Sequence, residues 1–280
     1  MQNNDTIRIA VLDLNNGAKN QGLRCILEIL DRYAKEKDIL FDTQVFDVRQ
    51  KNEVPDTSFD VYISSGGPGS PFDEEGWIWE QQFFSLINQL YKHNNEAEEC
   101  EKKHAFFICH SFQLACRFFK TGKVCKRKST SFGVFPMHKI WGGLNEPLFE
   151  NLPEPFYAVD SRDYQVIGPN FDQLNAIGAT VLAIEKERPH VPLERAIMAI
   201  RFSPEMIGTQ FHPEADANSM REHLLQDINK ERVISEHGEE KYFDMLDKLE
   251  DEDKIVLTQK IILPSFLDKA LERKHSTVNV

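Results

Sequence analysis

Short apolar runs alternate with segments of helical periodicity along the first 120 residues, and this alternation restricts the possible fold most strongly. The runs are short and rich in β-branched or aromatic residues, which is typical of buried strands. Strands that alternate with helices predict an α/β fold, with a mostly parallel sheet flanked by helices on both faces. Strands are expected at 7–12, 42–48, 60–64 and 105–108, and helices at 22–33, 77–91 and 112–119.

The rest of the chain divides into a second group of strands and a charged helical end. Further strand-like runs occur at 132–135, 156–159, 180–184, 196–202 and 207–211. From residue 219 the sequence combines helical spacing with many Asp, Glu and Lys residues, which is typical of solvated helices with one apolar stripe. We therefore expect one domain over residues 1–225 and a helical C-terminal extension, packed on it, over residues 226–280.

The charge composition limits the classes of partner that the chain is expected to bind. The chain has 33 Lys and Arg against 45 Asp and Glu, a formal net charge of −12. Nucleic acids and anionic membranes are bound by clustered positive charge, so we expect neither partner. No apolar run approaches the ~20 residues that span a bilayer. The first five residues lack the charged and apolar regions of a signal peptide. The oligomeric state is not indicated.

The cysteines indicate a reducing compartment. There are five, at positions 25, 100, 109, 116 and 125, and the number is odd and small for this length. A secreted disulfide framework is therefore not expected, and we predict a cytoplasmic protein. No two cysteines have the CxxC spacing of a zinc site, and we expect no metal and no cofactor.

Cys109 stands where a predicted strand meets a predicted helix. A side chain at such a turn is held at the sheet edge, next to the N-terminus of the following helix. The helix dipole and the free N–H groups there favour a thiolate over a thiol, and they can also receive an oxyanion. Cys109 is thus a candidate nucleophile.

A histidine and a glutamate that follow the last predicted strand supply what a thiol nucleophile needs. His212 and Glu214 flank Pro213, and a base held by a carboxylate would complete a Cys-His-Glu triad with Cys109. The sequence contains nine histidines, and His110 and His138 are alternative bases.

A glycine-rich turn follows the predicted strand at 60–64. The segment 64–71 reads Ser-Ser-Gly-Gly-Pro-Gly-Ser-Pro, and such a turn can direct backbone N–H groups at an anion. It matches neither the GxxxxGK[ST] nor the GxGxxG pattern, so a nucleotide phosphate site is disfavoured.

Together these segments resemble the class I (triad) glutamine amidotransferases. That family has a glycine-proline turn, a G-x-C-x-G-x-Q nucleophile elbow and a late F-H-P-E segment, in this order. The matching segments here are 65–69, 107–113 and 208–214. Weaker matches, at 132–136 and 161–166, resemble the segment after the nucleophile helix and the S-H-x-D-x-V segment of the family.

The resemblance implies a Rossmann-like (flavodoxin-like) fold and a thioester mechanism. Cys109 would attack the γ-amide of glutamine, His212 would move the proton, and Glu214 would hold the imidazole ring. The backbone N–H groups of Gly67 and His110 would form the oxyanion hole. The substrate would contact three further residues: Gln113, Ser161 and Arg162.

The sequence departs from the family at three positions. Phe107 and Ser111 replace the two glycines of the elbow, and Arg162 stands where the family usually has histidine. Homoserine O-acyltransferases share the fold and triad, and their elbow also lacks flanking glycines. That enzyme class, γ-glutamyl hydrolases and non-catalytic binding relatives are therefore alternatives. We expect ammonia to pass to a synthetase partner in trans, as in the amidotransferase half of GMP synthases.

Overall fold

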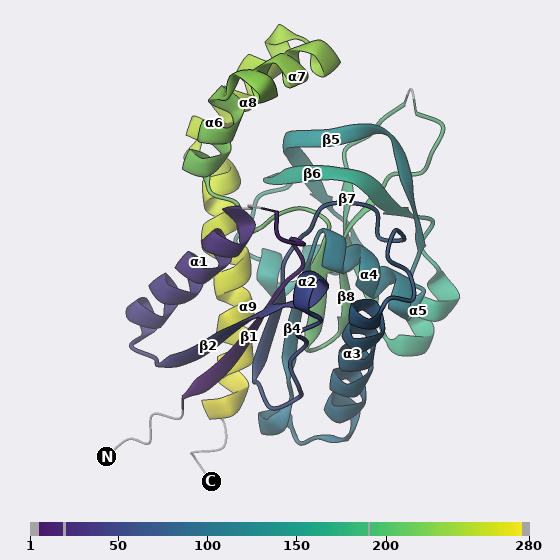
Figure 1. The fold of residues 1–280 in the computed structure, drawn as a ribbon, viewed down its shortest axis with the longest axis vertical. Coiled ribbons are helices and arrows are strands. Elements are labelled where there is room, and N and C mark those ends of the chain that lie inside the picture. Colours follow the sequence, from purple (N-terminus) through teal and green to yellow (C-terminus); the bar gives the residue numbers. More distant parts are fainter. Residues whose placement is uncertain (1–5, 19–20, 190, 276–280) are drawn as a thin grey trace.

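The computed structural model describes residues 6–18, 21–189 and 191–275. The expectation about a signal peptide depends on residues 1–5, which lie outside the described residues. Within these ranges, nine strands form one sheet in the order β2-β1-β3-β4-β9-β8-β7-β5-β6. Helices pack on both faces of the sheet (Figure 1). The predicted α/β fold is confirmed.

One half of the sheet is parallel, and its strands were each predicted to within a few residues. Four of these strands are largely apolar and buried because helices cover both faces of the sheet, whereas the edge strand at 41–47 is more polar and only partly buried. Neighbouring strands in this half pair in parallel. The strands are β1 (Ile7–Asp13), β2 (Phe41–Asp47), β3 (Val61–Ser64), β4 (His104–Ile108) and β9 (Met206–Thr209).

The other half of the sheet is antiparallel. It contains β5 (Lys123–Lys139), β6 (Phe156–Ile167), β7 (Thr180–Glu185) and β8 (Ile197–Ser203). Strand β5 begins nine residues before the predicted run at 132–135, because its basic first part lacks an apolar pattern and is held by pairing with β6. A register shift between Lys126 and Ser131 interrupts that pairing.

Two groups of helices enclose the sheet. On one face, α1 (Gln21–Lys37) and α9 (Leu257–His275) pack together with the sheet in one apolar cluster. On the other face lie α3 (Ile78–Glu96), α4 (His110–Phe119) and α5 (Phe171–Ile177), which belong to a second cluster. The one-turn helix α2 (Val48–Lys51) follows β2. No helix of the described residues is both long and apolar enough to cross a membrane.

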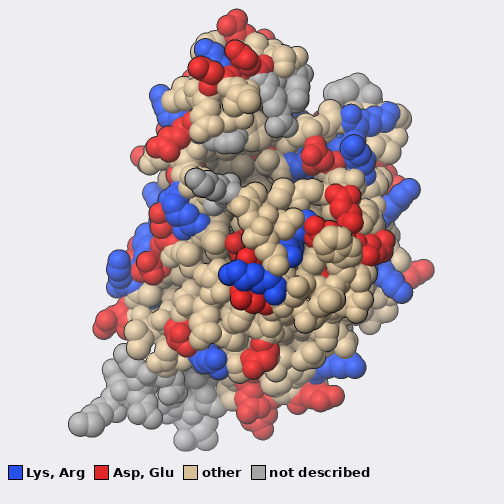
Figure 2. Space-filling model, viewed as in Figure 1, with Lys and Arg blue, Asp and Glu red and all other residues tan. Residues whose placement is uncertain are grey.

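The C-terminal part first leaves the body and then returns to it. Helices α6 (Ala217–Leu225), α7 (Asp227–His237) and α8 (Glu239–Glu250) form the projection at the top of Figure 1. Acidic side chains are prominent on this projection (Figure 2). Helix α9 then packs along the sheet, where the Phe266 ring lies 5.2 Å from that of Phe106. The division of the chain at residue 225 stays a prediction.

Candidate active site

Three parallel strands end at the same edge of the sheet, and the candidate residues follow them directly. The glycine-rich turn comes after β3, Cys109 after β4, and His212 after β9. Ligand sites of open α/β sheets lie at the carboxyl ends of the strands. A cavity of about 520 Å³ occupies this position, and the predicted site residues that line it are Gly67, Cys109, His110, Gln113, Ser161, Arg162, His212 and Glu214.

Cys109 occupies a strained backbone conformation between strand and helix. Its φ and ψ angles are 50° and −99°, which a residue with a side chain rarely adopts. Helix α4 begins at the next residue, His110. The first N–H groups of a helix have no partner within it, so the His110 N–H is available beside the thiol. This arrangement is the elbow predicted from the sequence.

The two elbow positions that lack glycine are accommodated by side chains that point away from the cavity. Phe107 packs in the core, with its ring 6.3 Å from that of Phe83. The Ser111 hydroxyl accepts a hydrogen bond from the Ile108 N–H (2.8 Å) and donates one to the Ser64 carbonyl (2.9 Å). Ser111 therefore links the ends of β3 and β4 beneath the nucleophile.

His212 lies between a carboxylate and the thiol. Its Nδ1 atom is 2.8 Å from Oε1 of Glu214, and its ring lies next to Cys109 in the cavity wall. Burial by itself lowers the pKa of His212, but the neighbouring Glu214 and Cys109 raise it well above its usual value. The structure thus brings the three predicted triad residues together in the order that a triad requires.

The other candidate bases lie in different surroundings. Burial, together with the charges of Arg49 and Arg117, lowers the pKa of His110 to about 3, so its ring stays neutral. His138 lies on β5 and contacts Glu154 at 3.1 Å. Of the three histidines, His212 is therefore the one that both contacts a glutamate and lines the cavity next to Cys109.

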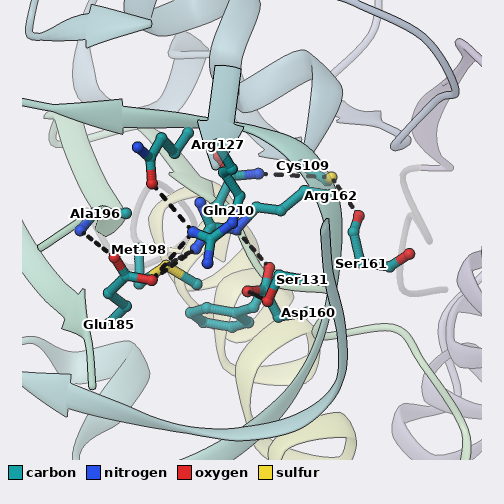
Figure 3. Close-up of polar contacts among 12 residues, drawn as sticks. Cys109, Arg127, Ser131, Asp160, Ser161, Arg162, Glu185, Ala196, Met198 and Gln210 are labelled. Carbon is teal, nitrogen blue, oxygen red and sulfur yellow. Dashed lines mark hydrogen bonds and ion pairs between the residues drawn. The ribbon is translucent and has the colours of Figure 1, made fainter. Parts of the chain in front are cut away.

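The sulfur of Cys109 has two further polar neighbours. The thiol donates to the backbone carbonyl of Ser161 on β6, and the side-chain amide of Gln210 donates to the sulfur, each at 3.6 Å. Figure 3 shows the sulfur between these two groups. Sequence reasoning placed Ser161 in the site but missed Gln210, although Gln210 lies only two residues before His212.

The glycine-rich turn approaches the site so closely that side chains would not fit. A Cβ atom on Gly66 would lie 2.9 Å from Cε1 of His212, and one on Gly67 would lie 2.3 Å from the Leu14 carbonyl oxygen. The Arg49 guanidinium donates a hydrogen bond to the Pro68 carbonyl at 2.7 Å, which anchors the turn. Glycine at position 67 thus lets the backbone turn against the end of β1.

Arg162, predicted as a substrate contact, lines the cavity and belongs to a buried ionic network. Its side chain is only 1% exposed, and it forms ion pairs with Asp160 (2.7 Å) and Glu185 (3.3 Å). The guanidinium is bound within this network (Figure 3). Glu185 also pairs with Arg127 and Arg188, so the network holds three arginines and two carboxylates. A contact between Arg162 and a substrate stays a prediction.

Two other contacts connect the site to its surroundings. Gln113 donates from Nε2 to Oε1 of Gln210 (3.0 Å) and to the Tyr164 carbonyl (3.3 Å). Gln259 of α9 donates to the backbone carbonyl of Glu214 at 3.1 Å. No sequence pattern indicated Gln259, because a solvated-helix pattern does not reveal which polar residue turns inward. Among the described residues, no group of three or more His, Cys, Asp or Glu side chains is placed to hold a metal ion.

Comparison with known proteins shows to which family the chain belongs. The sequence model named "Glutamine amidotransferase class-I" matches residues 25–231, which is most of the chain. The chain belongs to the class I glutamine amidotransferase family. The family assignment agrees with the resemblance seen in the sequence, whereas the comparisons give no support to the similarity to homoserine O-acyltransferases. No curated protein matches the chain.

Solved structures resemble this class I amidotransferase-family chain in fold. A glutamine amidotransferase from Thermotoga maritima superposes with a TM-score of 0.66 at 17% identity, covering 95% of this chain and 98% of its own. A glutamine amidotransferase from Methylobacillus flagellatus gives 0.60 at 14%, covering 96% and 94%. The CTPS glutaminase domain of Trypanosoma brucei with bound acivicin gives 0.58 at 12%, covering 98% and 96%. At these identities the likeness concerns the fold.

Proposed function

We propose that this protein hydrolyses the γ-amide of glutamine through a thioester on Cys109 and supplies the ammonia to a synthetase partner in trans. Family membership supports amidotransferase chemistry in general. The observation that carries the specific proposal is the His212–Glu214 hydrogen bond next to Cys109 at the strained elbow. Each member stands where the reaction needs a nucleophile, a base or a carboxylate.

The first half of the reaction forms the thioester. His212 takes the thiol proton, and the Cys109 sulfur attacks the γ-carbonyl carbon of glutamine. The C–N bond then breaks as His212 returns the proton to the leaving nitrogen, which departs as ammonia. In the second half, His212 activates water, which attacks the thioester carbon and releases glutamate and the thiol. Glu214 keeps Nδ1 of His212 protonated, so Nε2 is the atom that exchanges protons.

Charge on the tetrahedral oxygen needs N–H donors on the side of Cys109 that faces the cavity. The backbone N–H groups of Gly67 and His110 are our candidates for this oxyanion hole. Their surroundings support both candidates: a Cβ atom on Gly67 would lie 2.3 Å from the Leu14 carbonyl oxygen, and His110 is the first residue of α4. Gln113, Ser161 and Arg162, which line the cavity, are candidates for contacts with the glutamine substrate.

Two observations agree with a partner that acts in trans and with a reducing, cytoplasmic environment. Membership of the glutamine amidotransferase family supports a partner of the synthetase type that consumes the ammonia, as in GMP synthases. The nucleophile is a free thiol, which must stay reduced to act.

Ammonia release from glutamine tests the proposal. The wild-type protein, alone or with candidate synthetases, should release ammonia and glutamate in equal amounts, and the Cys109→Ser variant should release neither. Cys100→Ser is the matched control, because this cysteine lies outside the cavity, and it should keep full activity. Ammonia release that survives in Cys109→Ser would refute the role of Cys109.

A further inference from the structure

We propose that Gln210 is a second hydrogen-bond donor to the nucleophile and promotes formation of the Cys109 thiolate. The inference rests on the proposed function, because it assumes that Cys109 is the nucleophile. It adds a residue that touches the reacting atom and that lies outside the triad and the candidate oxyanion hole. The inference follows from how Gln210 is buried, how its amide is oriented, and what else contacts the sulfur.

The position of Gln210 is fixed by the sheet. Gln210 directly follows β9, is fully buried, and its backbone N–H donates to the Met198 carbonyl at 2.8 Å. The side chain extends to the nucleophile, with Nε2 3.6 Å from the Cys109 sulfur. A buried amide N–H that lacked an acceptor would cost about 1–3 kcal/mol, so the contact with sulfur is the one that this burial imposes.

Gln113 sets which end of the Gln210 amide faces the sulfur. The Gln113 Nε2 group can only donate hydrogen bonds, and its partners are the carbonyl oxygens of Gln210 (3.0 Å) and Tyr164 (3.3 Å). Because Oε1 of Gln210 accepts from Gln113, Nε2 of Gln210 must point to Cys109. The series Gln113, Gln210 and Cys109 thus presents an N–H group, not a carbonyl, to the sulfur.

The contacts of the sulfur fall into two groups with opposite preferences. The Ser161 carbonyl on β6 accepts from the thiol at 3.6 Å, and this contact is available only while the sulfur is protonated. The Gln210 N–H and the ring of His212, charged through Glu214, instead favour the thiolate. His110, which follows Cys109, stays neutral. Gln210 therefore opposes Ser161 and adds to the effect of His212.

The rate at which iodoacetamide alkylates Cys109, measured against pH in the full-length protein, tests this role. Gln210→Met keeps the side-chain volume and removes the donor. We expect the alkylation midpoint to move to higher pH and the rate at neutral pH to fall about tenfold, the effect of one hydrogen bond to a charged group. Gln89→Met, an exposed glutamine on α3, is the matched control and should leave the profile unchanged.

A second variant covers the case in which Gln210→Met does not fold. Gln113→Met does not touch the sulfur but releases the Gln210 amide, and it should move the midpoint in the same direction by a smaller amount. An unchanged midpoint in either folded variant would overturn the inference. Alkylation needs no glutamine, so this result is independent of whether the protein hydrolyses glutamine. A Cys109 that reacts normally in a protein without glutaminase activity would contradict only the proposed function.

Discussion

Gln259 in the last helix donates a hydrogen bond to the backbone carbonyl of Glu214, at 3.1 Å. Helix α9 therefore contacts the candidate triad as well as the core, because Phe266 of the same helix packs on Phe106 of β4. Helix α9 and the strand that precedes the nucleophile thus belong to one packed unit. Substitutions can separate the contribution of α9 to stability from the contribution of the site residues to activity.

The first prediction concerns the packing of α9. Phe266 is 2% exposed and lies against Phe106, so Phe266→Ala should lower the free energy of unfolding by about 3–5 kcal/mol. Phe243 on α8 is 53% exposed, and Phe243→Ala should change the free energy of unfolding by less than about 0.5 kcal/mol. Denaturant unfolding of both variants measures this difference. Equal losses would mean that α9 does not contribute to the core.

The second prediction concerns the charge that Glu214 places beside His212. The carboxylate helps to raise the pKa of His212, so the imidazolium persists to higher pH in the wild type. Glu214→Gln removes that charge and should lower this pKa. On the basic limb of the kcat/KM profile for glutamine, His212 loses the proton that it donates to the leaving nitrogen. This limb should therefore move to lower pH in the variant. A basic limb that stays in place would show that another group titrates there.

The third prediction concerns the oxyanion turn. A methyl group on Gly67 would lie 2.3 Å from the Leu14 carbonyl oxygen, so Gly67→Ala must displace the turn. Loss of one aligned donor should lower kcat by about 10²–10³-fold. Alkylation of Cys109 by iodoacetamide should continue in the variant, because the triad does not depend on this donor. Loss of both activities would instead indicate that the whole site had collapsed.

The fourth prediction concerns the serine that replaces a family glycine. Ser111→Gly restores the family residue but leaves the buried Ile108 N–H without its 2.8 Å acceptor. The free energy of unfolding should fall by about 1–3 kcal/mol. Ser129→Gly, at an exposed position of β5, should cost less than about 1 kcal/mol. A stabilised Ser111→Gly protein would contradict the role assigned to the hydroxyl.

The fifth prediction concerns Arg162. Arg162→His substitutes the residue usual in the family but disturbs the buried pairs with Asp160 and Glu185. We expect a loss of about 3–5 kcal/mol in unfolding free energy, measured by denaturant unfolding. Arg221→Ala breaks an exposed pair with Glu250 and should cost less than about 1 kcal/mol. An Arg162→His protein as stable as the wild type would contradict the structural role of the buried pairs.

The sequence predicted the parallel half of the sheet because its strands are short apolar runs that end in recognisable turns. It predicted Cys109, His212 and Glu214 as a group because a thiol at a strand-to-helix turn needs a base and a carboxylate, and because the segments around them resemble the family motifs. It missed the first residues of β5, since a basic strand that pairs with β6 carries no apolar periodicity. Propensity does not reveal pairing of this kind.

The side-chain contacts of the site were less accessible from the sequence. Gln210 and Gln259 are polar residues whose partners lie 101 and 45 residues away, so no local pattern indicates them. Arg162 was expected in the site from the family pattern, and it lines the cavity. Its pairing was not foreseen, because Glu185 of β7 becomes its neighbour only when the sheet is folded.

Mass spectrometry of the protein, quenched during glutamine turnover and then digested, tests the central claim most directly. Rapid acid quenching of the wild type, alone and with a candidate synthetase, should trap a glutamyl adduct on the peptide that contains Cys109. The adduct should be absent from Cys109→Ser. Ammonia release without any adduct on this peptide, or an adduct on another residue, would contradict the account.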